Sequence, residues 1–416
     1  MTFTGVSEKA AADHESDQRN LTSMETGALG GGLNVSDGHP RMPLTDSQRA
    51  IVEDLPALFD EAQKRVFEEI EAEAQQAFLH AIGQRQAPIG TGRLVSCYSS
   101  SVAMDITARA LAHRVGTVAL VHPTFDNIPD LLKGRSLTLL PLAEAELEHG
   151  EPDLPDEAGA VFVTTPNNPT GWVLSENGLR RLAAFCAHTN RVLAMDTCFR
   201  AQDTRAQYDT YAILRDSGAE WVVIEDTGKL WPTLELKAGF LAWGQNTDLP
   251  LLEYFSDVLL SVSPLVLLML TRFAQDAERG GYAKLHRLIA RNRGALAEVL
   301  DDGPVTLTDT DARISVARLT LPDNGPDAVA LYEKLVQRGT HILPCGPFYW
   351  DRQIVGARQV RLALARSEED VIRAARALVD ALRAPLGDGC RRTRERGSGK
   401  IFVGGDHRGA TVGRSV

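Results

Sequence analysis

The chain has 416 residues, of which 44% are hydrophobic and 24% charged, and its net charge is −11. This length and composition exclude disorder throughout and allow one large and one smaller α/β domain. No apolar run approaches the roughly 18 residues that span a membrane, and the acidic balance argues against nucleic acid as a partner.

The two ends of the chain differ from its body. Residues 1–19 are polar and acidic without the apolar core of a signal peptide, so we expect a cytoplasmic protein with a disordered N-terminal tail. Residues 387–416 hold seven Arg or Lys against three Asp or Glu, with eight glycines, and we expect a second disordered tail. A solvated extension is favoured there over a contact with anionic partners. The five cysteines lack a C-x-x-C pair, so no disulfide and no metal site is predicted.

Apolar residues at helical spacing predict helix from Thr45 to His80, interrupted at Pro56. Strand-like and helical runs then alternate. The strand-like runs are VALVHP near 117, LTLLPL near 137, AVFVTTP near 160, RVLAMD near 191, WVVIED near 221 and LKAGFLAW near 236. Nearly continuous apolar strands separated by helices predict a mostly parallel sheet covered on both faces.

A long helical stretch from Pro264 to Leu300 leads to further strands and helices, and the last helix starts at Ser367 with Asp370 three residues on, as in a capping box. These elements predict a smaller C-terminal α/β domain that shares its packing with the N-terminal helices. The predicted divisions are 45–85 for the N-terminal helices of the small domain, 86–290 for the large domain and 291–386 for the C-terminal part of the small domain.

Residues that carry chemistry follow the carboxyl ends of the predicted strands, where such sheets bind ligands. Pro166 to Gly171 reads P-N-N-P-T-G, Asp196 ends the next strand, and D-T-G-K ends at Lys229, with Lys237 eight residues later. In this order the set resembles the fold-type I aminotransferases of classes I and II. Their pattern is N-P-T-G, D-x-x-Y, then S-x-S-K with a basic residue eight positions on. The resemblance implies pyridoxal-5′-phosphate (PLP) as the cofactor and the PLP-dependent transferase fold, with a large domain around a mostly parallel sheet and a small C-terminal domain.

Each residue type has a chemical reason to be there. Lys229 would hold PLP as a Schiff base, which needs a partly deprotonated amine, a form that burial favours. Asp196 would stabilise a protonated pyridine nitrogen, Asn168 would donate a hydrogen bond to the phenolate oxygen, and Phe125 would cover the ring.

The phosphate of PLP needs N–H groups at a helix start, hydroxyls and a cation. Ser99, Ser100 and Ser101 precede a helical run, and Lys237 supplies the charge. Arg361, in V-R-L-A-L, matches the arginine that grips the substrate α-carboxylate. Taken singly, the three serines are typical of a helix cap, Arg361 of a surface strand residue and N-P-T-G of a turn. Their joint order and spacing favour the PLP interpretation.

Two positions depart from the aminotransferase pattern. Phe199 stands where D-x-x-Y has tyrosine, and D-T-G-K replaces S-x-S-K, so Asp226 adds a carboxylate three residues before the lysine. A carboxylate there suits a cationic substrate, and the alternative is that it only pairs with Lys237.

Longer segments give a narrower resemblance. NLTSMET, LNVSDGH, SCYSSSVAM, LVHPTFDNI, VFVTTPNNPTG, DTCFR, VVIEDTGKLWPTLELKAG and VRLALARS resemble the PLP-dependent L-arginine oxidases and hydroxylases of bacterial natural-product pathways, of the enduracididine type. The match runs from about Asn20 to Arg366, and EDTGKLWPT is far more specific than N-P-T-G. It implies a homodimer in antibiotic biosynthesis that oxidises L-arginine with O2 to 2-ketoarginine and 4-hydroxy-2-ketoarginine, without a metal or flavin.

This resemblance makes residues 20–44 a lid over the site. It implies that Thr22 and Glu25 contact the substrate, with Glu25 facing the guanidinium and Asp37 or Asp226 as further candidates. The alternative for Thr22 and Glu25 is a T-x-x-E capping box that only starts their own helix. Glycines at 27 and 30–32, each costing about 1 kcal/mol inside a helix, weaken the lid.

Two further roles come from the same resemblance. His39 is expected to be catalytic in hydroxylation, although a lone histidine in a loop is more often without a role, and Lys229 is the expected base. Cys198 takes a cofactor-contacting position where a serine is expected, and a thiol hydrogen bonds more weakly. An arginine 4,5-desaturase, a keto-acid-dependent aminotransferase and a non-enzymatic regulator are the alternatives that stay open.

Overall fold

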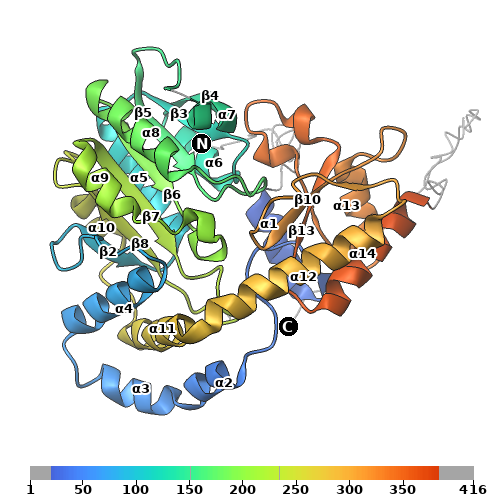
Figure 1. Ribbon diagram of the computed structural model, residues 1–416, viewed down its shortest axis with the longest axis horizontal. Helices are drawn as coiled ribbons and strands as arrows, with labels where there is room; N and C mark the ends of the chain where they lie inside the picture. Colours follow the sequence, from blue (N-terminus) through green and yellow to red (C-terminus); the bar gives the residue numbers. More distant parts are fainter. Residues whose placement is uncertain (1–19, 150, 234, 384–416) are drawn as a thin grey trace, which may run out of the picture. The chain divides into compact units, whose positions relative to one another are not determined.

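The computed structural model describes residues 20–149, 151–233 and 235–383 (Figure 1). By their contacts, these residues up to Leu382 form one compact unit, in which three sheets are found. The tails expected at 1–19 and 387–416 lie outside the described residues. No helix in the described part of the chain is both long and apolar enough to cross a membrane.

The main sheet has seven strands in the order β2-β8-β7-β6-β5-β3-β4. Only β8 runs against the others, because it pairs antiparallel with β2 and β7 while the remaining pairs are parallel. The predicted mostly parallel sheet is confirmed, and β2 is its one strand that was not predicted. The strands are β2 (Leu94–Cys97), β3 (Thr117–His122), β4 (Thr138–Ala143), β5 (Ala158–Thr164), β6 (Val192–Asp196), β7 (Glu220–Asp226) and β8 (Gly239–Trp243).

Alternate residues along the central strands bury into two separate cores. Val118 and Phe162 pack with one set of helices, whereas Ala119 and Val163 pack with the other. Because side chains alternate across a strand, a sheet covered on both faces needs apolar residues at every position. One core holds α5 (Ser100–Arg114), α6 (Asn127–Gly134) and α10 (Leu251–Val258), and the other holds α7 (Glu144–His149), α8 (Glu176–His188) and α9 (Thr210–Ser217). Figure 1 shows α8 and α9 in front of the sheet and α5 behind it.

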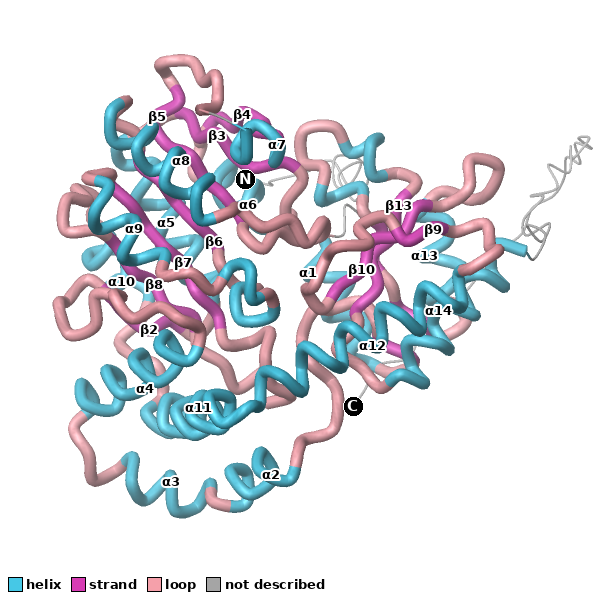
Figure 2. Tube along the Cα trace, viewed as in Figure 1, coloured by secondary structure: helices cyan, strands magenta, loops and turns pink. Residues whose placement is uncertain are grey.

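The C-terminal part contains a four-stranded antiparallel sheet in the order β12-β13-β10-β9. Figure 2 shows β9, β10 and β13 beside α12, α13 and α14. A short parallel pair joins β1 to β11, so the start of the described chain is tied to this part. The elements are β1 (Leu33–Asn34), β9 (Thr306–Leu307), β10 (Val316–Thr320), α13 (Ala328–Val336), β11 (Thr340–His341), β12 (Leu343–Pro344), β13 (Gln359–Ala363) and α14 (Glu368–Arg383). The predicted cap of the last helix is present, since the Asp370 amide donates to Ser367 Oγ at 3.2 Å.

Two expectations about helices differ from the structure. The stretch from Pro264 to Leu300 is not one helix, because non-helical backbone at Gly280, with φ 108°, separates α11 (Pro264–Asp276) from α12 (Tyr282–Leu300). The N-terminal helices α2 (Asp46–Glu53), α3 (Leu55–Ala62) and α4 (Phe67–Ala81) all contact α11, which lies in the predicted large domain. Pro56 falls in the first turn of α3, where proline is tolerated, so the predicted interruption is confirmed.

Candidate active site

A cavity lies where the carboxyl ends of β5, β6 and β7 meet the lid segment and β13. Nine of the residues predicted from the sequence line it, namely Glu25, Ser100, Ser101, Phe125, Asn168, Asp196, Cys198, Lys229 and Arg361. The structure therefore brings together side chains from both halves of the chain.

Lys229 lies in the turn after β7, and its amine points at a histidine. Lys229 Nζ is 3.2 Å from His39 Nε2, and Lys237 Nζ is also 3.2 Å from His39 Nε2. Burial and the charges of the two lysines lower the pKa of His39, so its imidazole is neutral and Nε2 accepts from the amines. His39 thus lies beside the predicted Schiff-base lysine.

Asp196 ends β6 with a fully enclosed carboxylate. Its Oδ1 accepts from the Cys198 amide at 3.0 Å, and no cation of the described residues forms an ion pair with it. Burial, despite hydrogen bonds from Cys198, raises the pKa of Asp196 to about 6. Burial also raises the pKa of the Cys198 thiol well above its usual value, so this cysteine is a neutral neighbour of the carboxylate.

Arg361 lies in β13 with its side chain 1% exposed. Nη1 donates to Asn168 Oδ1 at 3.1 Å, and Nη2 donates to Glu25 Oε1 at 2.7 Å and to the carbonyl oxygen of Ser36. The Arg361 guanidinium therefore links β13 to the N-P-T-G turn. The ring of Phe125 lies 5.9 Å from this guanidinium.

The start of α5 was predicted to hold the phosphate of the cofactor. Ser99 caps the helix, since its Oγ accepts from the Val102 amide, and Ser101 accepts from Asn127. The hydroxyl and amide of Ser100 donate to Asp226 Oδ2, at 2.6 and 3.3 Å. Although burial acts against it, the two nearby lysines and Ser100 lower the pKa of Asp226, so an anionic carboxylate stands at this helix start.

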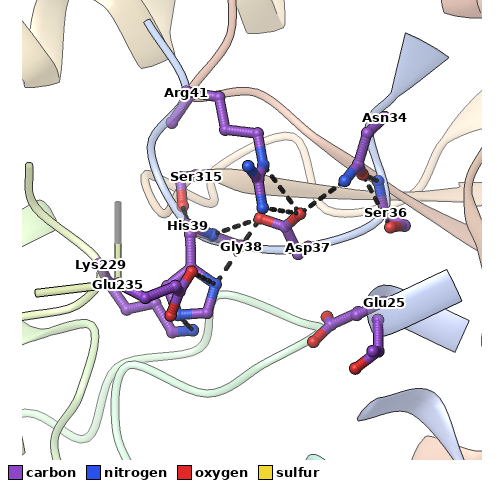
Figure 3. A network of polar contacts seen from close by, with 12 residues as sticks. Glu25, Asn34, Ser36, Asp37, Gly38, His39, Arg41, Lys229, Glu235 and Ser315 are labelled. Atoms are coloured by element: carbon purple, nitrogen blue, oxygen red, sulfur yellow. Dashed lines mark hydrogen bonds and ion pairs between the residues drawn. The ribbon is translucent and has the colours of Figure 1, made fainter. Parts of the chain in front are cut away.

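Asp37 belongs to a network that positions His39 (Figure 3). Its carboxylate accepts from the His39 amide, from Asn34 and from Arg41, and pairs with Arg366 at 3.2 Å. Burial is outweighed by these partners, which hold the pKa of Asp37 far below its usual value. Through these four contacts, Asp37 stabilises the loop around His39.

Thr22 and Glu25 lie on α1 (Leu21–Gly27), with different outcomes. The helix is capped by Asn20, whose side chain accepts from the Ser23 amide, so the capping-box alternative for Thr22 and Glu25 is wrong. Asn20, two residues earlier, offers the same kind of acceptor and therefore competes with Thr22 for the role. Glu25 reaches into the cavity and pairs with Arg361, whereas Thr22 is exposed.

Sequence reasoning missed two acidic residues at the site. Asp126 follows Phe125 and accepts from the Leu21 amide at 2.7 Å, and burial raises the pKa of Asp126 to about 6. Glu235 pairs with Lys237 at 2.7 Å and lies 3.5 Å from His39 Nδ1. Both lie close in sequence to predicted residues. What marks them is their contact with the lid segment, through Leu21 and His39, which the sequence does not reveal. The described residues hold no cluster of His, Cys, Asp and Glu suited to a metal ion.

The residues present fit PLP. Asp196 is a buried carboxylate that has no ion-pair partner among the described residues, and a protonated ring nitrogen would supply that partner. Lys229 offers the amine, and Asn168 and Phe125 line the same cavity. On the phosphate side, Ser100 and Ser101 line the cavity at the start of α5, and the Ser100 hydroxyl, which donates to Asp226 here, would have to turn to a phosphate.

Residues 65–378 match the family described as aminotransferase class I and II. The structure of MppP soaked with the product 2-ketoarginine is 46% identical to this chain, with a TM-score of 0.82, over 85% of this chain and 100% of that one. The aspartate aminotransferase of Thermus thermophilus with maleate is 17% identical, with a TM-score of 0.70, over 91% of this chain and 100% of the other, a likeness that shows the fold alone.

A curated relative matches only part of the chain. Cystathionine beta-lyase of Corynebacterium glutamicum is 25% identical over 138 residues. These residues make up 33% of this chain and 37% of the lyase, so the match spans well under half of that relative's length.

Proposed function

The chain belongs to the class I and II aminotransferase family and depends on PLP, and from this premise we propose that it oxidises L-arginine with O2. The proposed products are 2-ketoarginine and its 4-hydroxylated form. The observation that carries the proposal is the similarity to MppP over that protein's whole length, because the structure of MppP was soaked with its product 2-ketoarginine.

The chemistry that PLP supplies when bound is an electron-withdrawing ring that stabilises negative charge at the α-carbon of an amino acid. Lys229 attaches the cofactor and is the base for the substrate protons, since its amine is the one that lines the cavity. Asp196 holds the proton on the ring nitrogen. His39, neutral and 3.2 Å from Lys229 Nζ, is placed to take a proton from that amine.

Three carboxylates are candidates for binding the guanidinium of the substrate, and their contacts favour one. Asp37 is engaged by Arg41 and Arg366, and Asp226 by Ser100. Glu25 lines the cavity and has a single partner atom, Arg361 Nη2. We therefore assign Glu25 to the guanidinium and leave Asp37 and Asp226 positioning roles.

The test is oxygen uptake by the holoenzyme with L-arginine and no keto acid, with product analysis by mass spectrometry. We expect arginine-dependent uptake and 2-ketoarginine. L-Lysine should be a poor substrate because it lacks the planar fork that a carboxylate binds at two points. Lys229→Ala is the control and should lose both turnover and the visible absorbance of bound PLP.

Other outcomes identify the alternatives. Strict dependence on 2-oxoglutarate would overturn the oxidase and leave an ordinary aminotransferase, and a dehydroarginine product would indicate a desaturase. Phe199 lines the cavity where an aminotransferase has the tyrosine of D-x-x-Y, which favours the oxidase. The homodimer stays a prediction, which sedimentation of the holoenzyme would test.

A further inference from the structure

We propose that Glu235 passes protons from His39 to solvent, so that Lys229 can act as a base more than once on the same substrate molecule. The inference rests on the proposed function for the role of Lys229, and it adds the exit that this role needs. An amine that removes protons from successive carbons of one substrate must lose each proton before it takes the next.

The neighbours of His39 select one tautomer of its ring. Nε2 is 3.2 Å from the amines of Lys229 and Lys237, and a charged lysine only donates, so Nε2 accepts and Nδ1 carries the hydrogen. Nδ1 faces two carboxylates, at 3.6 Å from Asp37 Oδ1 and 3.5 Å from Glu235 Oε1. Contacts of this length often shorten once a site binds its ligands. Figure 3 shows Lys229 and Glu235 gathered around this ring, which can take a proton on one nitrogen and release one from the other.

Of the two carboxylates that face Nδ1, Glu235 is the one open to solvent. The Asp37 side chain is 3% exposed and is engaged by Arg41 and Arg366, so it offers a proton no way out. The Glu235 side chain is 48% exposed. Its Oε2 pairs with Lys237 at 2.7 Å, which leaves Oε1 toward the histidine.

His39 stands between two cavities. Lys229 lines the cavity that also holds Asp196 and Arg361, whereas His39 and Glu235 line a second cavity with which the first shares no residue. The contact of 3.2 Å between Lys229 Nζ and His39 Nε2 therefore joins the two cavities. A proton that crosses this contact leaves the substrate side without opening that side to water.

The backbone of Glu235 gives an independent reason to assign it a function. Its φ is 67°, in the left-handed region that favours glycine. The surrounding turn is closed by the Leu236 amide, which donates to the Thr233 carbonyl oxygen at 3.0 Å. Glycine would adopt this conformation at a lower cost, so the strain points to a use for the carboxylate.

The proton moves in three steps, and no electron is transferred. The Nζ–H bond of Lys229 breaks as an Nε2–H bond forms on His39. The Nδ1–H bond then breaks as an O–H bond forms on Glu235 Oε1, and Glu235 finally loses this proton to water. Although burial acts against it, the charges of His39 and Lys237 lower the pKa of Glu235, so the carboxylate is ionised at rest and releases a proton readily. Tautomer exchange with solvent then restores the ring.

The first experiment measures the ratio of 4-hydroxy-2-ketoarginine to 2-ketoarginine, because the hydroxylated product needs the further proton removals. Wild type, Glu235→Gln and Glu53→Gln holoenzymes are compared at saturating L-arginine, with and without added imidazole, at constant pH and ionic strength. Glu53 is exposed at the end of α2, so Glu53→Gln removes one negative charge away from the site.

We expect Glu235→Gln to lower this ratio about tenfold, less than the roughly hundredfold of a base that acts directly, because water partly substitutes. Imidazole, a mobile base that enters from solvent, should restore the ratio in Glu235→Gln and leave the other two proteins unchanged. A role of Glu235 in holding Lys237 alone would not respond to imidazole.

The second experiment needs neither cofactor nor turnover. Burial and the two lysines lower the pKa of His39, and the charge of Glu235 partly offsets this effect. We therefore expect a lower pKa of His39 in the Glu235→Gln apoprotein than in wild type, and no change in Glu53→Gln. The titration is followed by NMR, with the His39 signal assigned by its loss in His39→Ala.

Three results would overturn the inference. The first is a product ratio in Glu235→Gln that equals wild type or stays low with imidazole. The second is an unchanged pKa of His39, which would show that the carboxylate does not act on the ring. The third is a wild type that makes 2-ketoarginine alone, since Lys229 would then not be used again. Absence of arginine-dependent oxygen uptake would count against the proposed function, whereas the NMR titration judges the contact between Glu235 and His39 by itself.

Discussion

Asp196 shows at the scale of one residue how the site depends on its cofactor. Without PLP, burial raises the pKa of this carboxyl to about 6 from an ordinary value of 3.8. A raised folded-state pKa stabilises the fold below the unfolded-state pKa, and this contribution is lost as pH rises through the folded-state value. At 1.36 kcal/mol per pKa unit, the loss is about 3 kcal/mol between pH 4 and pH 8.

We therefore expect the free energy of unfolding of the apoprotein to fall more steeply with pH in wild type than in Asp196→Asn. Urea unfolding of both proteins across this pH range measures the difference. Asp126 titrates with the same sign in both proteins, so its contribution cancels. Parallel curves would contradict the assigned pKa. In the holoenzyme a protonated ring nitrogen would supply the missing cation, and the difference should shrink.

Some residues of the site could be predicted because they end a strand or follow one closely. Asp196, Lys229 and Asn168 each come at the end of an apolar run, and parallel strands end at one edge of a sheet. The partners of Asp37 could not be predicted, because Arg366 lies 329 residues away and nothing in either segment marks the pairing. The T-x-x-E motif was misleading for the same reason, since Glu25 pairs with a residue 336 positions away.

At the scale of elements, α1 and the loop with His39 separate oxidation from hydroxylation. Deletion of residues 1–29 also removes Glu25, so we expect weaker arginine binding. At saturating arginine we expect oxygen uptake to stay largely intact and 2-ketoarginine to rise at the expense of the hydroxylated product, because water reaches the site early. The deletion removes α1 but spares β1, which starts at Leu33. A chromatographic ratio of the two keto acids is the measurement, and deletion of residues 1–19 is the matched control because it keeps α1.

His39→Ala should shift the product ratio in the same direction, with one further effect. Since His39 Nε2 is 3.2 Å from Lys229 Nζ, we expect the visible absorbance of bound PLP to change as well, which the deletion should not cause. Equal product ratios in wild type, the 1–29 deletion and His39→Ala would show that neither element acts in hydroxylation.

The strands of the main sheet could be predicted because burial on both faces produces apolar runs, and six of its seven strands were. The four residues of β2 were missed, since so short a run carries no pattern. The break between α11 and α12 depends on the backbone at Gly280, where φ is 108°, and one glycine is also compatible with a continuous helix. Packing of α2, α3 and α4 on α11 follows from tertiary contacts that helical spacing does not specify.

On the scale of the molecule, Arg366 joins the lid segment to the C-terminal part. Its guanidinium is buried and donates to the carbonyl oxygens of Asn34, Asp37 and His39. Arg366→Ala would leave the Asp37 carboxylate buried without this cation, so we expect a loss of about 3–5 kcal/mol in the free energy of unfolding. Arg41→Ala is the control. It pairs with the same carboxylate from a side chain that is 34% exposed, and we expect a loss of at most about 1 kcal/mol. Equal losses in urea unfolding would show that Arg366 does not join these segments.

The pairing of β1 with β11 has a consequence for how the protein is made. A ribosome releases the lid segment first and residues 340–341, its partners, some three hundred residues later. Throughout that interval the large sheet can fold, since domains form as they emerge, while β1 lacks its partner strand β11. Arg361 and Arg366 also appear only at the end of synthesis. A nascent chain can therefore display Lys229 on a finished sheet before the C-terminal strands hold the lid segment in place. We expect PLP to reach its lysine most easily in this window.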